Sequence, residues 1–311
     1  MINIGIVGVN ELSKKHIEKI IEIPDFNISG FYDRDEESSK NIEKIYGLRR
    51  FESYAELVNY SDAVDILTPV GTHFNFAEDA IRNCRHVFVD KVLSENLEEA
   101  KELNRLAYEA NIQLYVSRYE KFHKNFILLK RLLNNPLYIE SSKFDANIIN
   151  LSPEHLVFDL LLTELDMVLS IVKANVKRVR ATGACLHGDI VDFVNVRIEF
   201  DNGCIYNMLG GSFNSKQQNK ISFFQKNKTY SLDLNNFKIL VLNSNEEENP
   251  DHHEEILKNS GKNHNEMIKR ELEHFAGQIS NHKLNLRTLH VNYQPIEVAH
   301  EIIERLKINV S

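Results

Sequence analysis

The sequence predicts an α/β protein whose first part forms a parallel sheet and whose second part is α+β, with an open, mainly antiparallel sheet. Short apolar runs alternate with amphipathic helical patterns over residues 1–120, which is typical of a parallel sheet with helices on both faces. Beyond residue 120, strand patterns follow one another with few helices between them. A chain of 311 residues is long enough for two domains, which we expect at 1–120 and 121–311.

The elements of the first part follow one another in regular alternation. Each strand run ends in polar residues, and each helical run has apolar residues at helical spacing on one side. This order predicts a Rossmann-type domain. We expect strands at 2–9, 28–35, 63–69, 86–91 and 113–120, and helices at 13–22, 37–47, 73–84 and 96–111.

The second part begins with a helix, a strand and a long apolar helix, and then becomes rich in strands. The D-N-G segment at 201–203 predicts a tight hairpin turn. The chain closes with two helices, and we expect the last one to pack back on the first domain. We expect helices at 124–135, 153–174, 265–279 and 294–306, and strands at 137–146, 176–187, 191–200, 204–213, 220–226, 228–234 and 237–243.

Composition excludes several classes of function. A net charge of -8 argues against nucleic acid or an anionic membrane as a partner. The start of the chain resembles no signal peptide and no apolar run reaches a membrane span, so we expect a cytoplasmic protein. Cys84, Cys185 and Cys204 have no metal-binding spacing, and we expect reduced, buried thiols. The acidic stretch around His252 and His253 is interpreted as a solvated loop, so we predict no metal site.

The first strand runs into a turn and a helix, an arrangement that commonly holds a dinucleotide pyrophosphate. Gly8 occupies the first glycine position of G-x-G-x-x-G, while Asn10 and Ser13 occupy the second and third. Asn10 tolerates a left-handed backbone, so we expect the turn to keep its shape although the side chain intrudes on the phosphate path. Ser13 is small enough to keep the helix close to the strand. Glu11 places a negative charge where an anion would bind.

Asp33 follows the second strand, about 20 residues beyond the turn, where a carboxylate accepts hydrogen bonds from ribose hydroxyls. Its charge favours NAD over NADP, and the adjacent Arg34 softens that preference. The alternative is a carboxylate that caps the following turn. Polar residues from Thr68 to His73 end the third strand. Lys91 ends the fourth strand, either as a group that polarises a carbonyl or as an ordinary surface lysine.

The long helix of the second part carries a narrow polar stripe. Asp159, Thr163 and Asp166 stand at i, i+4 and i+7 in a helix that is otherwise strongly apolar. Such a stripe needs polar partners, which either a ligand cleft or buried backbone groups supply. Both interpretations stay open.

Taken together, these segments resemble the Gfo/Idh/MocA family, which includes glucose-fructose oxidoreductase and inositol dehydrogenase. The resemblance implies a Rossmann domain joined to an open antiparallel sheet, NAD(P) as cofactor, and hydride transfer at a sugar or nucleotide-sugar carbon. It also implies a homo-oligomer, a dimer or tetramer, formed through the C-terminal sheet. The segments are GIVGVNELSKKH ending at His16, FYDRDEE, DAVDILTPVGTHFNFAEDAI, HVFVDKVL, VSRYEKFHKNF, FDLLLTELDMVLSIV and VRIEFDNGCIYNMLGGSF.

The resemblance assigns roles to residues of this chain. The family's helix histidine, helped by the lysine of an E-K-P segment, exchanges the proton of the reacting hydroxyl. The implied catalytic positions are Lys91, Thr163 and Asp166. The implied cofactor contacts are Gly8, Asn10, Leu12, Ser13, Asp33, Arg34, Thr68, Pro69, His73, Asp90 and Lys91, and the implied substrate contacts are Lys91, Lys121, His123, Asp159, Thr163 and Asp166.

Several of these positions depart from the family pattern. Thr163 replaces the catalytic histidine, and a threonine hydroxyl cannot act as a general base near neutral pH. The E-K-P segment has become Asp90, Lys91 and Val92, and the glycine turn is altered as described above. NAD binding is therefore expected to be weak or lost.

Three possible functions remain open at this stage. The first is an NAD(P)-dependent oxidoreductase in which a buried Lys91 serves as acid and base, assisted by Asp166 or His123. The second is a catalytically inactive relative that binds a ligand or regulates a partner protein. A third, weaker possibility is a cleft that binds a ligand with no nucleotide.

Overall fold

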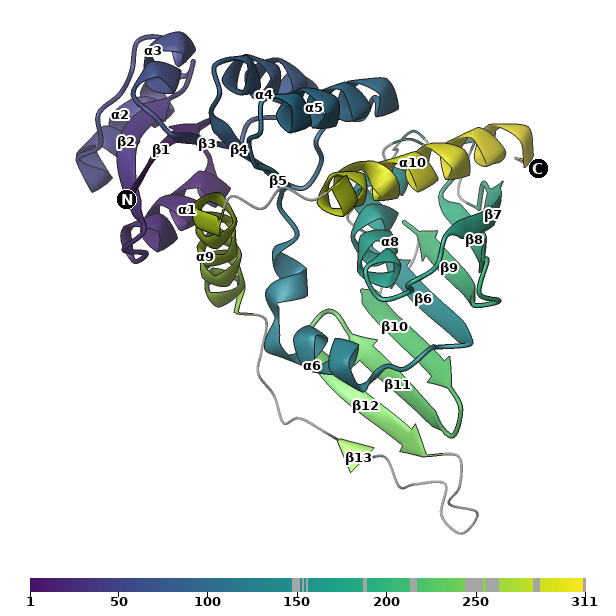
Figure 1. Cartoon of the computed structure of the whole chain (residues 1–311). Coiled ribbons are helices and arrows are strands. Elements are labelled where there is room, and N and C mark those ends of the chain that lie inside the picture. Colours follow the sequence, from purple (N-terminus) through teal and green to yellow (C-terminus); the bar gives the residue numbers. More distant parts are fainter. Residues whose placement is uncertain are drawn as a thin grey trace. The chain divides into compact units, whose positions relative to one another are not determined.

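The computed structural model contains two compact units (Figure 1). The first comprises residues 1–122 and 264–294, and the second comprises 123–263 and 295–311. The first unit is therefore discontinuous in sequence, because a segment near the end of the chain returns to it. The structure describes residues 1–146, 152, 154, 156–186, 189–212, 217–243, 254–255, 263–281 and 286–309.

The first unit is built on a parallel sheet of five strands in the order β2-β1-β3-β4-β5. Because β1 lies between β2 and β3, the chain leaves β1 on one side and returns on the other, which creates a topological switch point at the carboxyl ends of β1 and β3. The predicted Rossmann-type sheet is confirmed. The strands are β1 (Ile2–Val7), β2 (Phe26–Tyr32), β3 (Ala63–Ile66), β4 (His86–Val89) and β5 (Leu114–Val116).

Helices cover the parallel sheet, and their ends follow local sequence signals. Asn10, Asp35, Ser53 and Asn96 each cap a helix by accepting hydrogen bonds from backbone amides of its first turn. The elements are α1 (Glu11–Ile21), α2 (Glu36–Tyr46), α3 (Tyr54–Asn59), η1 (Val70–Thr72), α4 (His73–Arg82), α5 (Leu97–Glu109), η2 (Tyr119–Phe122) and α9 (His264–Asn281).

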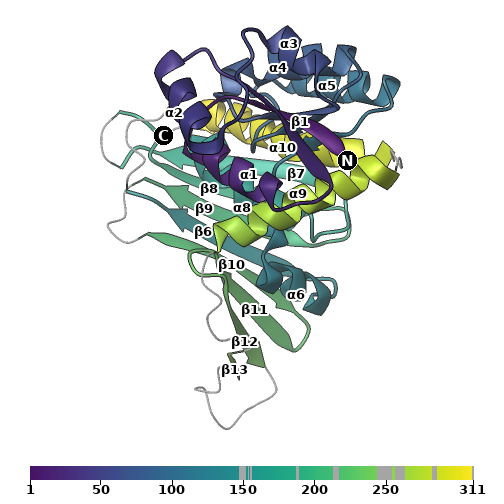
Figure 2. The same ribbon diagram turned by 90° about the vertical axis from the view of Figure 1, so that its left-hand side faces the viewer.

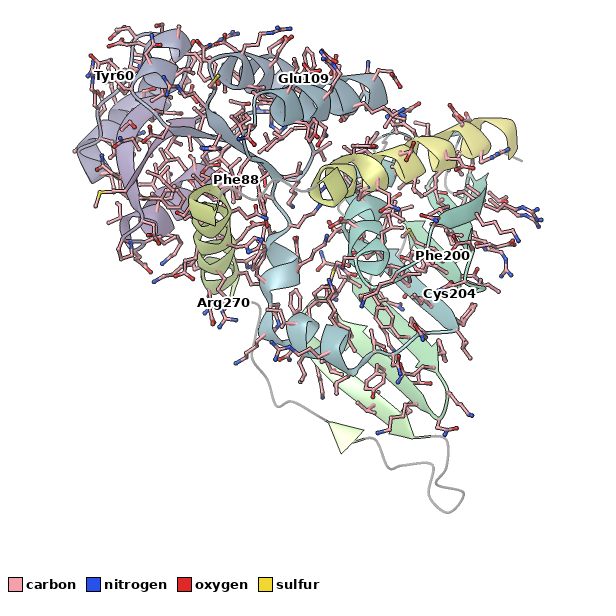
Figure 3. All side chains as sticks on the ribbon, in the orientation of Figure 1. Tyr60, Phe88, Glu109, Phe200, Cys204 and Arg270 are labelled. Carbon is pink, nitrogen blue, oxygen red and sulfur yellow. The ribbon has the colours of Figure 1, made fainter. Side chains whose placement is uncertain are left out.

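The core of the first unit lies between the sheet, α1 and α9. Phe88 of β4 is fully buried there (Figure 3) and contacts the ring of Phe275 from α9, with ring centroids 5.4 Å apart. Helix α9 also buries Ile268, Leu272 and Ile279 in this cluster. It thus completes the core of the first unit, although we had assigned residues 121–311 as a whole to the second domain.

The second unit is built on a sheet of eight strands in the order β13-β12-β11-β10-β6-β9-β8-β7 (Figure 2). Strands β6 and β9 pair in parallel, and the other described pairs are antiparallel, as expected for a mainly antiparallel sheet. The strands are β6 (Tyr138–Phe144), β7 (Val176–Ala184), β8 (Phe193–Phe200), β9 (Ile205–Gly211), β10 (Gln218–Gln225), β11 (Lys228–Asp233), β12 (Lys238–Asn243) and β13 (Glu254–Glu255).

The two faces of the larger sheet differ in character. On one face, Val196, Met208 and Ile221 are fully buried. The opposite face presents polar and charged side chains such as Glu140 and Lys220. The helical elements of this unit are α6 (Lys124–Leu132), the π-helix η3 (Leu156–Leu161), α8 (Leu162–Leu169) and most of α10 (Leu286–Asn309).

One helical prediction differs from the structure. The long helix expected at 153–174 is a π-helical segment followed by the short helix α8. The packing of the last helix on the first domain stays a prediction, and from Pro295 onward this helix belongs to the second unit. There Leu306 lies against Gly183 of β7, at 3.3 Å from the position that a Cβ atom would occupy.

Further expectations concern thiols, histidines and membrane spans. Cys204 is buried as expected, but Cys84 is exposed and Cys185 is partly exposed, so the expected burial of all three thiols is wrong. His252 and His253 lie outside the described residues. Within the described part of the chain, no helix is both long and apolar enough to cross a membrane.

Candidate functional site

The turn between β1 and α1 follows the path expected of a dinucleotide turn. Gly8 has a φ of +94°, and a Cβ at this position would lie 2.8 Å from Cγ2 of Thr68 and 3.0 Å from the backbone nitrogen of that residue. Glycine is therefore required by both the backbone angle and the close approach of the β3 loop. The Gly8 amide donates to the carbonyl oxygen of Tyr32, which joins the turn to the end of β2.

The Asn10 side chain caps the N-terminus of α1. Its Oδ1 accepts hydrogen bonds from the amides of Leu12 (2.8 Å) and Ser13 (2.9 Å), and its Nδ2 donates to the carbonyl oxygen of Leu67 (2.7 Å). Ser13 Oγ in turn accepts from the Asn10 amide, which completes a capping box. The Asn10 backbone is extended, with a φ of −154°, so the turn does not use the left-handed conformation that asparagine tolerates.

Asp33 is positioned by the end of β2, and both of its carboxylate oxygens accept hydrogen bonds from backbone amides. Oδ2 accepts from the Val9 amide (2.5 Å) and Oδ1 from the Asp35 amide (2.6 Å). The carboxylate thus connects the β1 turn to the turn that follows β2. The hydrogen bond from Asp35 is the turn-capping role considered above as the alternative to ribose binding. Arg34, the next residue, is exposed.

The His73 ring holds the loop after β3 in place through two hydrogen bonds. Its ring is buried, with Nε2 2.6 Å from the carbonyl oxygen of Thr68 and Nδ1 2.6 Å from that of Val92. The Thr72 hydroxyl hydrogen-bonds to the Thr68 hydroxyl (2.8 Å) and to the carbonyl oxygen of Pro69 (2.7 Å). His73 therefore links the loops that follow β3 and β4.

Lys91, after β4, has an exposed side chain, so the burial that we assumed for this lysine is wrong. Its φ is +49°, an uncommon conformation for a residue with a side chain. The Arg118 guanidinium donates a hydrogen bond to the carbonyl oxygen of Lys91, and the Lys91 Nζ lies 5.7 Å from the centroid of the Tyr119 ring. Burial raises the pKa of the neighbouring Asp90, although Lys91 and His16 act in the opposite direction.

Beneath these loops lies a buried ionisable group of residues that the sequence analysis did not detect. His16 Nδ1 lies 2.8 Å from Oδ2 of Asp65, and both side chains are buried. Burial lowers the pKa of His16, but Asp65, with help from Asp90 and Glu271, raises it above its ordinary value. A sequence signal was present, because Asp65 interrupts the apolar strand AVDIL.

Glu271 of α9 is the third member of this buried group. Its Oε2 accepts from the Ser117 hydroxyl (2.8 Å), and its Oε1 accepts from the Arg118 amide and from the Tyr115 hydroxyl (3.3 Å). Burial raises the pKa of Glu271 to about 7, against the opposing effects of these hydrogen bonds and of His16. The sequence signal was a carboxylate on the apolar face of α9.

In the second unit, the expected stripe of Asp159, Thr163 and Asp166 is divided among three environments. Asp159 is exposed, Thr163 is partly buried and Asp166 is buried. The π-helix changes the angular spacing between residues, so the expected i, i+4, i+7 alignment does not apply across this segment. Burial lowers the pKa of Lys130, and Asp166 opposes that effect, which places the buried carboxylate near a cation of α6.

A second buried polar group lies beside Thr163. Glu164 is 1% exposed, and its Oε1 lies 3.2 Å from Nζ of Lys143 on β6. The Tyr206 hydroxyl hydrogen-bonds to the Ser141 hydroxyl at 2.7 Å. No role is predicted for these residues from the sequence.

Lys121 and His123 lie where the chain connects η2 to α6. Lys121 belongs to η2, in the first unit. His123 is buried in the second unit, where its ring stacks on Phe237 with centroids 3.9 Å apart and its Nδ1 accepts from the Asn125 amide. The structure thus gives His123 a packing and capping role.

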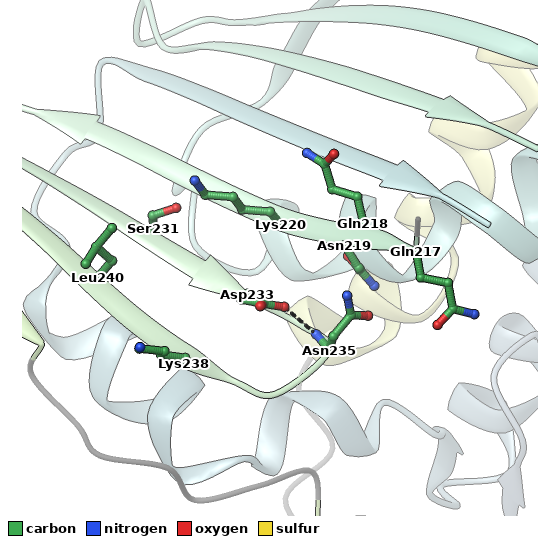
Figure 4. A pocket seen from close by; sticks show the side chains of 9 residues that line it. All are labelled: Gln217, Gln218, Asn219, Lys220, Ser231, Asp233, Asn235, Lys238 and Leu240. Atoms are coloured by element: carbon green, nitrogen blue, oxygen red, sulfur yellow. Dashed lines mark hydrogen bonds between the residues drawn. The ribbon is translucent and has the colours of Figure 1, made fainter. Parts of the chain in front are cut away.

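A pocket of about 420 Å³ lies on the second unit and contains none of the predicted site residues (Figure 4). Asp233 accepts a hydrogen bond from the Asn235 amide at its edge (2.8 Å). Among the described residues, no group of three His, Cys, Asp or Glu side chains could hold a metal ion. The pocket is lined by Gln217, Gln218, Asn219, Lys220, Ser231, Asp233, Asn235, Lys238 and Leu240.

The parallel sheet, its switch point and the β1–α1 turn define a protein with a Rossmann-type dinucleotide-binding fold. Residues 2–118 match the family model GFO_IDH_MocA, described as an oxidoreductase family with an NAD-binding Rossmann fold. The chain belongs to the Gfo/Idh/MocA oxidoreductase family.

Known relatives extend the likeness over both units. UDP-N-acetylglucosamine 3-dehydrogenase of Acidithiobacillus ferrooxidans is 26% identical over 237 residues, which cover 75% of this chain and 74% of that protein. A solved structure of that enzyme has a TM-score of 0.86 at 21% identity and covers 99% of this chain and 98% of its own. Apo scyllo-inositol dehydrogenase from Lactobacillus casei has a TM-score of 0.78 at 16% identity, covering 100% of this chain and 97% of its own.

The family has an NAD-binding Rossmann fold, so the question is whether the residues of the β1–α1 turn leave room and hydrogen-bond donors for a dinucleotide. A pyrophosphate at a Rossmann turn is held by free backbone amides at the helix start. Here the amides of Leu12 and Ser13 donate to Asn10 Oδ1. The turn as it stands therefore does not fit a pyrophosphate bound in this way.

Proposed function

We propose that this chain binds a sugar or nucleotide sugar and that its own hydride transfer is slow or absent. The observation that carries the proposal is Thr163, which stands where the family pattern has its catalytic histidine. An alcohol side chain cannot accept a proton from a sugar hydroxyl near neutral pH, and loss of a general base costs about 10²–10⁴-fold in rate.

The carboxylates beside Thr163 do not supply a substitute base. Glu164 is buried against Lys143, at 3.2 Å. Asp166 is buried as well and lies near Lys130; burial lowers the pKa of Lys130, and the Asp166 charge opposes that effect. Asp159 is exposed, but it lies in the π-helical segment, one turn before Thr163.

The ligand class is supported by the names of the relatives. They include dehydrogenases of UDP-N-acetylglucosamine, glucose 6-phosphate and myo-inositol. All three compounds are polyhydroxylated rings, and we propose that this chain recognises the same chemistry. A homo-oligomer formed through the sheet of the second unit is part of the proposal, because the exposed Phe224 and Leu137 add apolar surface there.

A slow NAD(P)-dependent oxidoreductase is the second candidate, and the exposed Lys91 favours it. An ammonium group at the carboxyl end of β4 is available to polarise a substrate oxygen. The Asp33 carboxylate at the end of β2 disfavours a 2′-phosphate, so NAD rather than NADP is the expected nucleotide in that case.

The test combines calorimetry with a turnover assay. Purified protein is titrated with UDP-N-acetylglucosamine, myo-inositol and glucose 6-phosphate without nucleotide, and is then assayed for reduction of NAD⁺ and NADP⁺ with each. Thr163→Val serves as the matched control, since it removes the hydroxyl at nearly constant shape. We expect binding of at least one compound and no turnover in either protein. Wild-type turnover near the usual enzyme range of about 1 s⁻¹ or more, or binding of none of the three, overturns the proposal.

A further inference from the structure

We propose that Asn10 is a built-in occupant of the place where a dinucleotide pyrophosphate would bind, so that nucleotide affinity is limited by displacement of this side chain. The inference concerns the first unit and does not depend on the role proposed for Thr163. It rests on the position of Asn10 in the sheet, on the hydrogen bonds of the surrounding amides, and on the charges at the start of α1.

Asn10 spans the switch point of the parallel sheet. Its Oδ1 accepts from the first turn of α1, which follows β1, while its Nδ2 donates to the carbonyl oxygen of Leu67, directly after β3. Ligands of open parallel sheets enter the crevice between such strand ends. The side chain therefore bridges the two walls of the crevice with three hydrogen bonds.

The other amides of the turn are also engaged within the chain. Val9 donates to Asp33, Asn10 donates to Ser13 Oγ (2.7 Å), and Lys14 donates to the Asn10 carbonyl oxygen (3.2 Å). Together with Gly8, Leu12 and Ser13, which donate as described above, six amides between residues 8 and 14 have an internal acceptor. A phosphate oxygen that accepts from any of these six amides has to replace its present acceptor.

The charges at the start of α1 also disfavour a bound phosphate. Glu11 is exposed, and its carboxylate accepts a hydrogen bond from Lys14 at 2.5 Å. That hydrogen bond and the charge of Lys14 lower the pKa of Glu11, so the carboxylate is ionised near neutral pH. A negative side chain in the first turn already interacts with the helix dipole and repels a second anion.

Asn10 is a neutral occupant that a phosphate can displace at a definite cost. Displacement loses one helix cap and one hydrogen bond to a backbone carbonyl, each of which contributes about 1 kcal/mol. The affinity for a dinucleotide is therefore expected to be reduced by about 10- to 100-fold relative to a chain with glycine at this position.

The experiment is a calorimetric titration of NADH into the full-length wild type and three variants, after removal of any nucleotide that co-purifies. Asn10→Gly removes the occupant and keeps a residue suited to a helix cap. Asn10→Asp keeps an oxygen that accepts from the Leu12 and Ser13 amides and adds a negative charge. Asn96→Gly is the matched control, because Asn96 caps α5 through the amides of Glu98 and Glu99.

We expect the Asn10→Gly variant to bind NADH at least about tenfold more tightly than the wild type. The Asn96→Gly variant should match the wild type, and Asn10→Asp should bind no better than it. Three results overturn the proposal: a gain from Asn10→Gly below about threefold, tight binding by Asn10→Asp, or no detectable binding by Asn10→Gly.

A second measurement keeps the proposal testable if Asn10→Gly fails to fold. Amide hydrogen exchange of the wild type reports on the Leu12 and Ser13 amides with and without NADH. We expect protection of both amides that saturating NADH reduces or leaves unchanged. Stronger protection of both on adding NADH at low concentration would show that the nucleotide is not excluded, and would overturn the proposal.

Discussion

Replacing Glu271 by glutamine should stabilise the protein above neutral pH and leave it nearly unchanged in acid. The carboxyl group is buried near the middle of α9, and burial raises its pKa to about 7. Glutamine has the shape of the protonated acid. Its amide oxygen accepts from Arg118, and its amide nitrogen donates to the Ser117 oxygen.

The sign and size follow from proton linkage. An unfolded chain releases the Glu271 proton near 4.5, whereas the folded chain holds it until about pH 7. The folded protein therefore binds more protons between these values, and its stability falls as pH rises through this window. The loss amounts to about 3 kcal/mol once the carboxyl is ionised in both states. The raised pKa of His16 acts in the same direction at higher pH, since its stabilisation is present below 6.5 and lost as pH rises through its folded value.

The assay is urea unfolding of wild type and Glu271→Gln at about pH 5 and about pH 8, followed by circular dichroism. Glu273→Gln is the control, because Glu273 lies on the same helix and is exposed. We expect a stabilisation of up to about 3 kcal/mol at the higher pH for Glu271→Gln and a change within about 0.5 kcal/mol for the control. A variant that is destabilised equally at both pH values would refute the reasoning, because the native carboxylate would then be ionised and held as the counter-ion of His16.

Three further substitutions test other parts of the structure by thermal or urea unfolding. Gly8→Ala should destabilise by about 1–3 kcal/mol, because the new Cβ meets the β3 loop at a positive φ; an unchanged midpoint would contradict the turn geometry. Tyr206→Phe leaves the buried Ser141 hydroxyl without its partner and should cost about 1 kcal/mol, whereas a gain in stability would argue against that hydrogen bond. Lys143→Met leaves the buried Glu164 carboxylate without its cation, so a loss of about 3 kcal/mol is expected near neutral pH; an unchanged unfolding midpoint would argue against this ion pair.

Much of the fold could be predicted because its elements have strong local signals. The five parallel strands are short apolar runs, and the helices between them have one apolar side. Helix α3 was missed although Ser53 and Glu56 have capping-box spacing, since its six residues carry too short a pattern. The π-helix η3 was missed because its residues are almost all apolar, so no period distinguishes it from an α-helix.

The candidate site was less predictable, because the roles of its residues depend on contacts between distant segments. Sequence spacing placed Asn10 and Asp33 at the correct strand ends, but not the hydrogen bonds that each makes. The hydrogen bond from Arg118 to the Lys91 carbonyl oxygen joins positions 27 residues apart, which local sequence patterns do not reveal. The buried group around His16 joins α1 and β3 to a helix that begins only at His264, a separation that no local pattern spans.

The place of α9 in the first unit has a consequence for the synthesis of the chain. A ribosome delivers residues 1–122 first, yet the hydrophobic cluster that includes Phe88 lacks Leu272, Phe275 and Ile279 until the final part of the chain has emerged. The first unit of the nascent chain therefore keeps apolar surface exposed to solvent while the entire second sheet is translated. Contacts of such high sequence separation slow folding and expose the intermediate to aggregation. A stand-alone version of this unit would accordingly need residues 264–281 joined to residues 1–122 by a linker.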